Sequence, residues 1–510
     1  MRPSPLPEHI LRSIWLRQAF RTSDLHTADG APVNILFPGR LNTDGGPDCV
    51  GARIRIGNTL FHGDVELHVA DTSWNTHRHS TDPHYNRVIL HVVLTTGTRI
   101  TPSRTASKRS IPVLILDSYL DDASFAANPL RLPSTSDTAS ILCRDANDSV
   151  PTALLRRWLT SLGRMRIELR VRIMHERLQQ LMLERRPVVQ DTRLPYRGSP
   201  DEIPPPSRDF SLKEYAAREP WDQLLYENIM EGMGYAKNRQ PFIMLARSVR
   251  LTFLRKLGLG DSLATQAVLF GAAGLLPPSH TLPERDSRNY VRQLRRRWKE
   301  LRPVLNRPLL HEGDWLFFRL RPSNFPTARL AAMCFSMPVL FGDDALRLLI
   351  SAFKEKTLKT DERLRMISSL LSFVPDVFWS HHVHFRGSAR DGGIVIGEAR
   401  ILDLTVNTLI PFALLYGRTF KDHDTANGAL GLLASMPPLQ ENVVTRLIHR
   451  ELVRQKFDLA SPVEQQGALQ LYKRYCRSGR CEECDVGRFI GFRPLSMHGR
   501  KPDLTERSQG

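Results

Sequence analysis

LFHGDVELHV (residues 60–69) and VILHVVLT (residues 88–95) are the two stretches that most restrict the fold of this 510-residue chain. Both are rich in β-branched and apolar residues, and turns containing Gly, Asn, Asp or Pro separate them from shorter runs of the same kind at 33–37, 52–56 and 111–116. An amphipathic helix is predicted before them, at residues 8–20. Short strands bounded by turns and preceded by a helix predict a mixed α/β domain, which we place at residues 1–125.

The rest of the chain has helical periodicity. We predict a long basic helical segment at 140–186, a Pro-rich linker or insertion at 187–210, a helical domain at 211–470 and a cysteine motif at 471–495. Within the helical part, eight helices are predicted, at 221–257, 263–276, 290–301, 326–337, 345–355, 364–371, 400–416 and 443–454. The predicted fold class is therefore α+β: an N-terminal mixed-sheet domain, then a mainly α-helical body with a C-terminal cysteine motif.

Composition excludes several classes of protein. Hydrophobic residues make up 41% and charged residues 24%, which excludes a wholly disordered or fibrous chain. The net charge is +18, and 59 of the 71 cations are arginine, a balance that suits phosphate partners such as nucleic acid or reflects a GC-rich genome. Six cysteines are too few for a disulfide scaffold. Because no apolar run reaches membrane-spanning length and no signal-like core is present, we expect a cytoplasmic protein that does not bind membranes.

Carboxylates gather on the predicted sheet. Alternate side chains of a strand share a face, so Asp64, Glu66 and His68 are expected to point the same way. Asp48 comes just before the partner strand and is expected to reach the same point. Two carboxylates on adjacent strands are suitable ligands for Mg²⁺ or Mn²⁺. The alternative is a solvated polar strand face.

Histidines are concentrated in the same region. Six of the 17 histidines fall within 30 residues: His62, His68, His77, His79, His84 and His91. His77 and His79 are predicted to lie in a polar loop, and His91 to be buried in its strand or to line the same cleft. These residues form either a functional site or, for His91, a hydrogen-bonded core position. Zinc binding through His77 and His79 is a further alternative.

The N-terminal pattern resembles the PD-(D/E)XK nuclease superfamily, with Pro-Asp, a hairpin and then an acid on the next strand. The resemblance implies that Asp48 is the motif aspartate, that Glu66 is the second metal ligand and that Glu8 is an accessory acid. His68 stands where that motif has lysine, so an inactive relic of the fold is an alternative.

A cysteine motif, Cys476-x4-Cys481-x2-Cys484, closes the chain. Thiolates at this spacing can share a soft metal, either zinc or a [4Fe–4S] cluster, and Cys143 is the preferred fourth ligand, ahead of Cys49 and His498. Some nucleases of the superfamily named above carry such a cluster on one distant and three C-terminal cysteines. Three reduced surface thiols are the alternative.

Arginine-rich segments offer further candidates. The helices at 156–186 and 292–299 could follow a phosphate backbone, although such a run is more often a solvated helix face. In Arg319-Leu-Arg321-Pro-Ser-Asn-Phe-Pro-Thr-Ala-Arg329, Thr327 could cap the next helix and the arginines could bind an anion. A packing turn is the interpretation that we favour for this segment.

Several segments together resemble a bacterial family called domain of unknown function 2851. The resemblance covers nearly the whole chain and rests on Gly45-Gly-Pro-Asp48, Gly63-Asp-Val-Glu-Leu-His68, Trp74-x2-His77-x-His79, Tyr85-Asn-Arg-Val-Ile-Leu-His91, Gly234-Tyr-x2-Asn238 with Pro241-Phe242, Phe270-Gly-x2-Gly274, Arg321-Pro-x-Asn-Phe-Pro326, Asn407-x3-Pro411 and the terminal cysteines. Residues 187–209 look like an insertion relative to that family. The resemblance implies no particular activity.

The sequence favours a metal-dependent nuclease that hydrolyses phosphodiester bonds of DNA or RNA. Asp48 and Glu66 would hold the metal, and His68 would assist with charge or protons. The accessory candidates are Glu8, Asp64, His77, His79 and His91. Two alternatives remain: a non-catalytic scaffold that binds nucleic acid or protein, and a hydrolase of another phosphate ester that uses the histidines.

Overall fold

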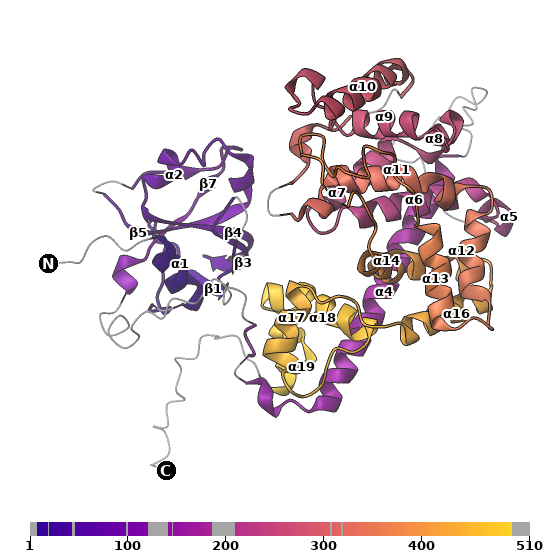
Figure 1. Ribbon diagram of the computed structural model, residues 1–510. Helices are drawn as coiled ribbons and strands as arrows, with labels where there is room; N and C mark the ends of the chain where they lie inside the picture. The colour runs from indigo at the N-terminus through magenta and orange to yellow at the C-terminus, as the bar shows by residue number, and fades with distance from the viewer. Residues whose placement is uncertain are drawn as a thin grey trace, which may run out of the picture. The chain divides into compact units, whose positions relative to one another are not determined.

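The computed structural model describes residues 8–491 except 19, 43–45, 98–99, 121–140, 145, 186–209, 306–308, 318–319 and 391. These residues form two compact units (Figure 1). Unit 1 contains the chain up to residue 163, residues 441–459 and the chain from residue 466 onward. Unit 2 contains residues 164–440 and 460–465. The predicted Pro-rich segment at 187–210 lies, apart from Phe210, outside the described residues.

A mixed sheet forms the first part of unit 1. Its strand order is β1-β3-β4-β5-β8, with β2 also paired to β3, and its strands are β1 (Val33–Phe37), β2 (Arg40–Leu41), β3 (Cys49–Ile56), β4 (Thr59–Ala70), β5 (Val88–Thr95) and β8 (Val113–Ile115). Strands β1 to β4 pair antiparallel, whereas β4, β5 and β8 pair parallel. The short strands β6 (Ser103–Arg104) and β7 (Ser110–Ile111) form a separate pair.

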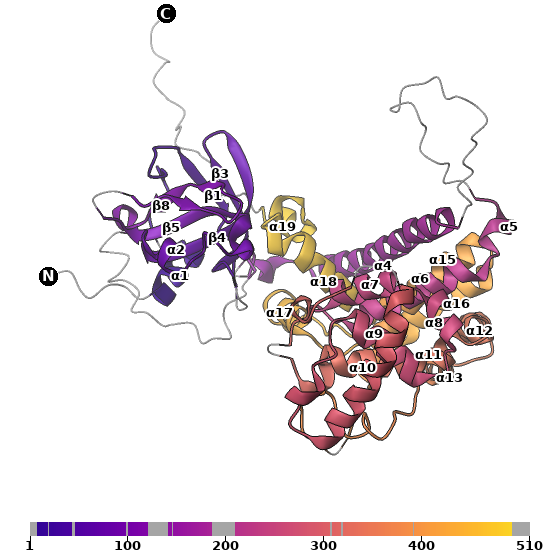
Figure 2. The same cartoon turned by 90° about the horizontal axis from the view of Figure 1, so that it is seen from above.

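Helix α1 (Glu8–Arg17) covers the sheet through its apolar face. Its buried side chains, among them Leu11 and Trp15, share one core with Ile54, Val65 and Leu90 of the sheet. The indole of Trp15 also donates to the carbonyl of Pro38 at 2.9 Å. Figure 2 shows α1 and the single-turn helix α2 (Ser73–Thr76) beside the strands. The expected order of helix and strands is thus confirmed.

The register of the sheet places the functional candidates side by side. In the parallel pair β4–β5, Glu66 lies opposite His91, and in the antiparallel pair β3–β4, Cys49 lies opposite Val65. The antiparallel pairing shifts between Cys49 and Ala52, where Gly51 has a positive φ of 72°. A bulge of this kind turns the strand next to Asp48.

The C-terminal helices belong to unit 1. The first turns of α4 (Thr152–Leu183) share a core with α17 (Val443–Ile448), the later part of α18 (Pro462–Arg474) and the segment up to α19 (Asp485–Phe489). Contacts with the sheet reinforce this grouping, since Arg53 donates to the carbonyl of Gly479 at 3.4 Å and forms an ion pair with Glu482 at 3.8 Å. Segments far apart in sequence therefore fold together.

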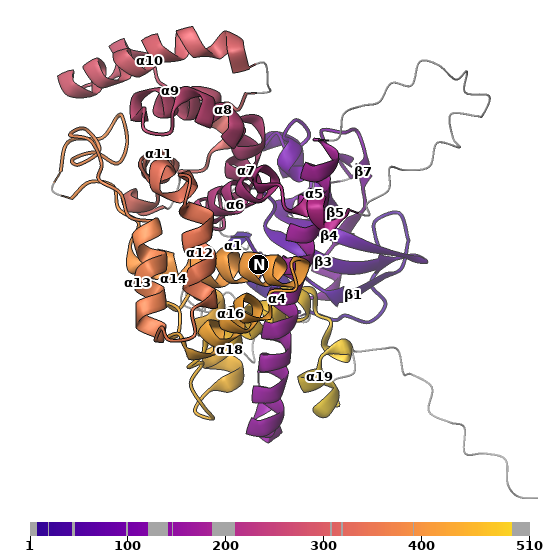
Figure 3. The same cartoon turned by 90° about the vertical axis from the view of Figure 1, so that its right-hand side faces the viewer.

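Unit 2 is helical. Besides the rest of α4, its helices are α5 (Leu212–Tyr215), α6 (Arg218–Met233), α7 (Arg239–Ser248), α8 (Leu251–Leu257), α9 (Ser262–Ala272), α10 (Arg285–Leu305), α11 (Pro326–Phe341), α12 (Ala345–Lys354), α13 (Thr360–Leu370), α14 (Glu398–Leu404), α15 (Ile410–Thr419) and α16 (His423–Ser435). Figure 3 shows α9 beside α10, and α12 beside α13. A single apolar core joins them. The α+β class predicted from sequence is thus confirmed.

Two details of the helical prediction were wrong. The segment 221–257 is not one helix, because it breaks at Gly234–Asn238 and again at Val249 and Arg250. Helices α16 and α18 were not predicted. Thr327 lies in the segment for which a packing turn was favoured over a helix cap, and it does not cap α11: the hydroxyl of this buried residue donates to the carbonyl of Val383 at 2.7 Å.

One helical stretch of the described chain, Glu398–Thr419, is long and apolar enough to cross a membrane by length and composition alone. The sequence analysis predicted none. This stretch lies in the core of unit 2, with 67% of its most apolar window buried, and core helices of globular proteins commonly pass the same test.

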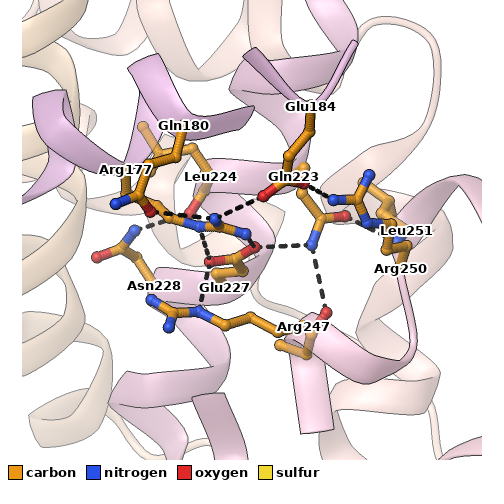
Figure 4. A network of polar contacts seen from close by, with 11 residues as sticks. Arg177, Gln180, Glu184, Gln223, Leu224, Glu227, Asn228, Arg247, Arg250 and Leu251 are labelled. Atoms are coloured by element: carbon orange, nitrogen blue, oxygen red, sulfur yellow. Dashed lines mark hydrogen bonds and ion pairs between the residues drawn. The ribbon is translucent and has the colours of Figure 1, made fainter. Parts of the chain in front are cut away.

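A buried polar network stabilises the helices around α6 (Figure 4). The carboxylate of Glu227, which is 1% exposed, accepts from Arg177 at 2.7 and 2.8 Å, from Arg247 at 3.2 Å and from the amide of Gln223 at 3.1 Å. Gln223 in turn accepts from the backbone of Leu251 at 2.9 Å. Every partner of this charge comes from the protein itself, which is the arrangement that makes a buried carboxylate structural.

Candidate metal centre

Two carboxylates meet where β3 begins beside β4. The backbone amide of Asp48 donates to Glu66 at 2.8 Å, and the carboxylate of Asp48 accepts from the backbone amide of Leu67 at 3.2 Å. Both acids are buried, with exposures of 8% and 5%. Burial, followed by the charge of Glu66, raises the pKa of Asp48 from 3.8 to about 7, against the lowering effect of Arg12. One arginine does not fully offset the charge of the pair.

The positive charge that is present comes from α1. The Nε atom of Arg12 lies 2.8 Å from Asp48, and Arg12 also forms an ion pair with Glu8 one turn earlier at 3.6 Å. Glu8, the predicted accessory acid, is thus near the carboxylates but reaches them through a guanidinium. Sequence reasoning missed Arg12, whose position four residues after Glu8 is an ordinary helical ion-pair spacing.

Four of the six clustered histidines meet beside Glu66. The Oε1 atom of Glu66 lies 3.3 Å from Nε2 of His79 and 3.5 Å from Nε2 of His68. Nε2 of His68 also lies 3.2 Å from Nδ1 of His77, and Nδ1 of His68 lies 2.9 Å from Nε2 of His91. The loop after β4 folds back to bring His77 and His79 over the strand.

The loop that carries these histidines has its own supports. Trp74 is fully buried and donates from its indole to the carbonyl of Arg104 at 2.9 Å. Arg78, between the two loop histidines, has a positive φ of 59°. The ring of Tyr85 stacks on His79 with 3.8 Å between centroids. These contacts fix the side chain of His79 next to Glu66.

The imidazoles of His68 and His91 are held in the neutral form. Burial, and then the neighbouring histidines, lower the pKa of His68 far below its usual value. Burial lowers the pKa of His91 to about 3, and His79 adds to the effect. Neutral imidazole is the form that binds metal ions.

The donor set fits a divalent transition metal. One nitrogen each from His68, His77 and His79 can be chosen such that all three lie within 4.8 Å of one another. The 3.2 Å between His68 and His77 is close to the separation, about 3.3 Å, of two nitrogens bound to one tetrahedral zinc ion. Within the described part of the chain, buried Nε2 of His79 has no hydrogen-bond partner. A cation would satisfy it.

A chain of contacts through His91 to Ser103 orients His68. Nε2 of His91 lies 2.9 Å from Nδ1 of His68. The other ring nitrogen of His91, Nδ1, lies 2.7 Å from the hydroxyl of Ser103. Such chains fix the tautomer of a ligating imidazole and leave its outer nitrogen free for the metal. Ser103, on the separate strand pair, had no signal in the sequence.

The remaining candidates either have other partners or are exposed. Asp64 accepts from the amide of Gly51 at 3.0 Å and lies 3.8 Å from Arg87. His62 is exposed, and His84 is an exposed partner of Asp82 at 2.8 Å. Strand alternation placed Asp64 on the correct face, but its carboxylate is engaged by other groups.

The four candidate cysteines also converge in unit 1. Cys143, Cys476 and Cys484 share one hydrophobic cluster, and burial, then the charges of Cys143, Cys484 and Cys481, raise the pKa of Cys476 well above 9. All six cysteines are free thiols. Among the described residues, no three thiols lie within ligand distance of one another. Cys49 is buried in the sheet core instead, and His498 lies outside the described residues.

Comparison with known proteins identifies the family. The profile described as "Protein of unknown function (DUF2851)" matches residues 8–188 and 211–442, so this chain belongs to the DUF2851 family. The unmatched stretch between these ranges coincides with the Pro-rich segment that looked like an insertion. The match ends before the terminal cysteines, which the sequence analysis had counted among the family features. No curated protein and no solved structure matches this chain, so the comparisons give no support to the nuclease resemblance.

Proposed function

We propose that unit 1 is a metal-dependent hydrolase that cleaves phosphodiester bonds of DNA or RNA. The observation that carries the proposal is the convergence of His68, His77, His79 and Glu66 next to a second buried carboxylate, Asp48. A cation at this point would offset the acidic pair and satisfy Nε2 of His79.

The donor types narrow the choice of metal. Three imidazole nitrogens and one carboxylate oxygen suit Mn²⁺ or Zn²⁺ better than Mg²⁺, which prefers oxygen ligands. Of the two ions expected from sequence, Mn²⁺ is therefore the better candidate. When bound, such a cation lowers the pKa of a water molecule and stabilises charge on a phosphate.

The protein residues would supply the rest of the reaction. Asp48, with its raised pKa, is suited to take a proton from water near neutral pH. Arg12, 2.8 Å from Asp48, orients that carboxylate. His91 and Ser103 keep His68 in the metal-binding tautomer.

The phosphate substrate is suggested by arginines near Asp64 of β4. Arg87, whose side chain is 77% exposed, lies 3.8 Å from Asp64, two residues from Glu66. Burial, followed by the charge of Arg40 and, more weakly, that of Arg87, lowers the pKa of Arg477. Three guanidiniums therefore gather near one end of the site, where a nucleic-acid backbone could bind.

The test is calorimetric titration of Mn²⁺ into chelator-washed full-length protein, with cleavage of DNA and RNA measured on the same samples. We compare wild type with D48A/E66A, and use D24N as the matched control. Asp24 is exposed and has a positive φ of 58°, a conformation that asparagine tolerates, so D24N changes charge alone.

We expect binding and cleavage in wild type and D24N, and neither in D48A/E66A. Cleavage that survives in D48A/E66A would sink the proposal. Metal-independent, salt-sensitive nucleic-acid binding without cleavage would favour the scaffold alternative. Metal-dependent hydrolysis of small phosphate esters, without cleavage of DNA or RNA, would favour a hydrolase of another phosphate ester.

We also propose that Cys143, Cys476, Cys481 and Cys484 bind zinc or a [4Fe–4S] cluster. The support is that the chain buries Cys143 in the same hydrophobic cluster as Cys476 and Cys484, where burial disfavours free thiolates. Burial raises the pKa of Cys484 as well, against the lowering effect of the backbone amides of Gly487 and Val486 and of the indole of Trp158. Metal analysis of purified wild type and C143S distinguishes the ions, and equal metal content in both would contradict the role of Cys143.

A further inference from the structure

Unit 2 contains two buried arginines on one tyrosine ring. The guanidinium of Arg400 lies 3.7 Å from the ring centroid of Tyr235, and that of Arg329 lies 5.1 Å from it. Arg329 and Arg400 are only 5% and 9% exposed. Both come from helices, Arg329 from α11 and Arg400 from α14.

Arg329 is buried with neutral partners. Its NH2 group donates to the hydroxyl of Tyr235 at 2.8 Å and to Asn324 at 2.7 Å, and its NH1 group donates to the carbonyl of Val395 at 3.3 Å. Within the described ranges it forms no ion pair, and its Nε atom has no partner. A buried guanidinium without a counter-ion is costly unless something else supplies negative charge.

Arg400 is only partly compensated. One NH1 contact joins it to Asp403 at 3.1 Å, on the next turn of α14. Its Nε atom is buried and has no partner among the described residues. Burial lowers the pKa of Arg400 despite Tyr235 and Asp403, and the charge of Arg239 contributes to the lowering. The nearby Glu231 is already engaged by Arg170 and Arg239.

The backbone around the pair is unusual. Tyr235 has a positive φ of 52°, which is strained for an aromatic residue. A Cβ atom at Gly234 would lie 2.4 Å from the carbonyl oxygen of Asn238, so the turn depends on glycine. Directly after Arg400 and Asp403, the helix widens into a π-helical turn at Thr405–Leu409. Strained residues and π-helical turns occur most often at functional sites.

Three segments that carry the family resemblance meet here. Tyr235 belongs to the first, Asn324 to the second, and Asn407, which donates to the carbonyl of Asp403 at 3.0 Å, to the third. Sequence alone had suggested an anion site for Arg319, Arg321 and Arg329. Of these, Arg329 is in the cluster, Arg321 is exposed and Arg319 lies outside the described residues.

We propose that Arg329, Arg400 and Tyr235 form a binding site for the terminal phosphate group of a small molecule. The two unpartnered Nε atoms supply donors, and the phosphate supplies the missing negative charge. Tyr235 is half-buried, and the side chain of Arg239, whose charge acts on Arg400, is 38% exposed.

A small ligand is favoured over a nucleic-acid backbone. Both guanidiniums are more than nine-tenths buried, so an internal phosphodiester, which continues in two directions, has poor access to them. A terminal phosphate needs only one opening. The site is independent of the metal centre, since all its residues belong to unit 2.

The test is calorimetric titration of inorganic phosphate, a nucleoside monophosphate and a short oligonucleotide without terminal phosphates into the full chain. Variants R329Q and R400Q remove one guanidinium each. R296Q is the matched control, because Arg296 is 87% exposed and has only a weak contact, at 3.9 Å, with Glu300. The same titrations on D48A/E66A separate this site from the proposed metal centre.

We expect phosphate and the monophosphate to bind wild type, R296Q and D48A/E66A alike, and to bind R329Q and R400Q about 10- to 100-fold more weakly. If the glutamine variants do not fold, R400K, which keeps the charge but loses the planar fork, is expected to bind phosphate about tenfold more weakly than wild type. Unchanged phosphate affinity in R400Q or R400K would overturn the proposal. So would an absence of phosphate binding to wild type, or binding of the oligonucleotide alone.

Discussion

Glu227 in the helical unit and Asp48 with Glu66 in the sheet unit are both buried carboxylate sites, but they are compensated differently. Glu227 has two arginines and a glutamine amide directly on its oxygens. Asp48 has one guanidinium, from Arg12, whereas Glu66 faces the imidazoles of His68 and His79. A charge with all its partners in the chain stabilises the fold. A buried charge that lacks such partners needs a ligand to offset it. This difference distinguishes the metal centre from the Glu227 network.

The largest expected effect is the loss of stability when Glu227 is removed. E227A leaves Arg177 partly buried without its main counter-charge, so we expect the free energy of unfolding to fall by about 3–5 kcal/mol. Urea denaturation measures it, and E300Q, which changes an exposed acid, is the control. A loss below about 1 kcal/mol would show that the network is not structural.

Removing one nitrogen ligand is the next largest effect. H79F keeps a ring against Tyr85 but removes Nε2, so we expect Mn²⁺ affinity to fall by about 100-fold, or about 2.7 kcal/mol, without loss of stability. H84A, at an exposed histidine of the same region, is the matched control. Equal Mn²⁺ affinity in H79F and wild type, by calorimetry, would remove His79 from the site.

A smaller effect on Mn²⁺ affinity is expected when the hydroxyl of Ser103 is removed. S103A removes the hydroxyl that lies 2.7 Å from His91, so the tautomers of His91 and His68 are less firmly set. We expect Mn²⁺ affinity to fall about tenfold, or about 1.4 kcal/mol. S149A, which removes an exposed hydroxyl of the same unit, should leave the affinity unchanged.

A further expected effect is a pH dependence of stability in metal-free protein. The pKa of Asp48 is raised from 3.8 to about 7 by burial and by Glu66. Between these values the folded state holds a proton that the unfolded state has released, so this group lowers the free energy of unfolding as pH rises from about 4 to 7.

D48N cannot lose a proton, so its stability relative to wild type should increase across that pH range and level off above it. Urea denaturation at pH 4, 6 and 8, without metal, measures the difference. A difference that is constant with pH would mean that Asp48 titrates normally, and the contrast with Glu227 would then disappear.

Local pattern predicted the parts of the site that depend on strand geometry. The alternation of β4 placed Glu66 and His68 on one face, and the hairpin brought Asp48 to them, as its 2.8 Å contact with Glu66 shows. The same pattern could not show that Asp64 is engaged by Gly51, because that contact depends on a bulge in the neighbouring strand. Arg12 and Ser103 were also missed, since their contacts cross between elements.

The sequence by itself determined the secondary-structure class, the family and the identity of the chemistry-bearing residues, because these depend on local periodicity and residue type. Only the tertiary structure decided which of them meet. It folded His77 and His79 back over Glu66, joined Cys143 to the terminal cysteines and placed Arg329 and Arg400 on one ring. The physical reason is that burial and charge compensation depend on contacts between residues far apart in sequence, and no local pattern records them.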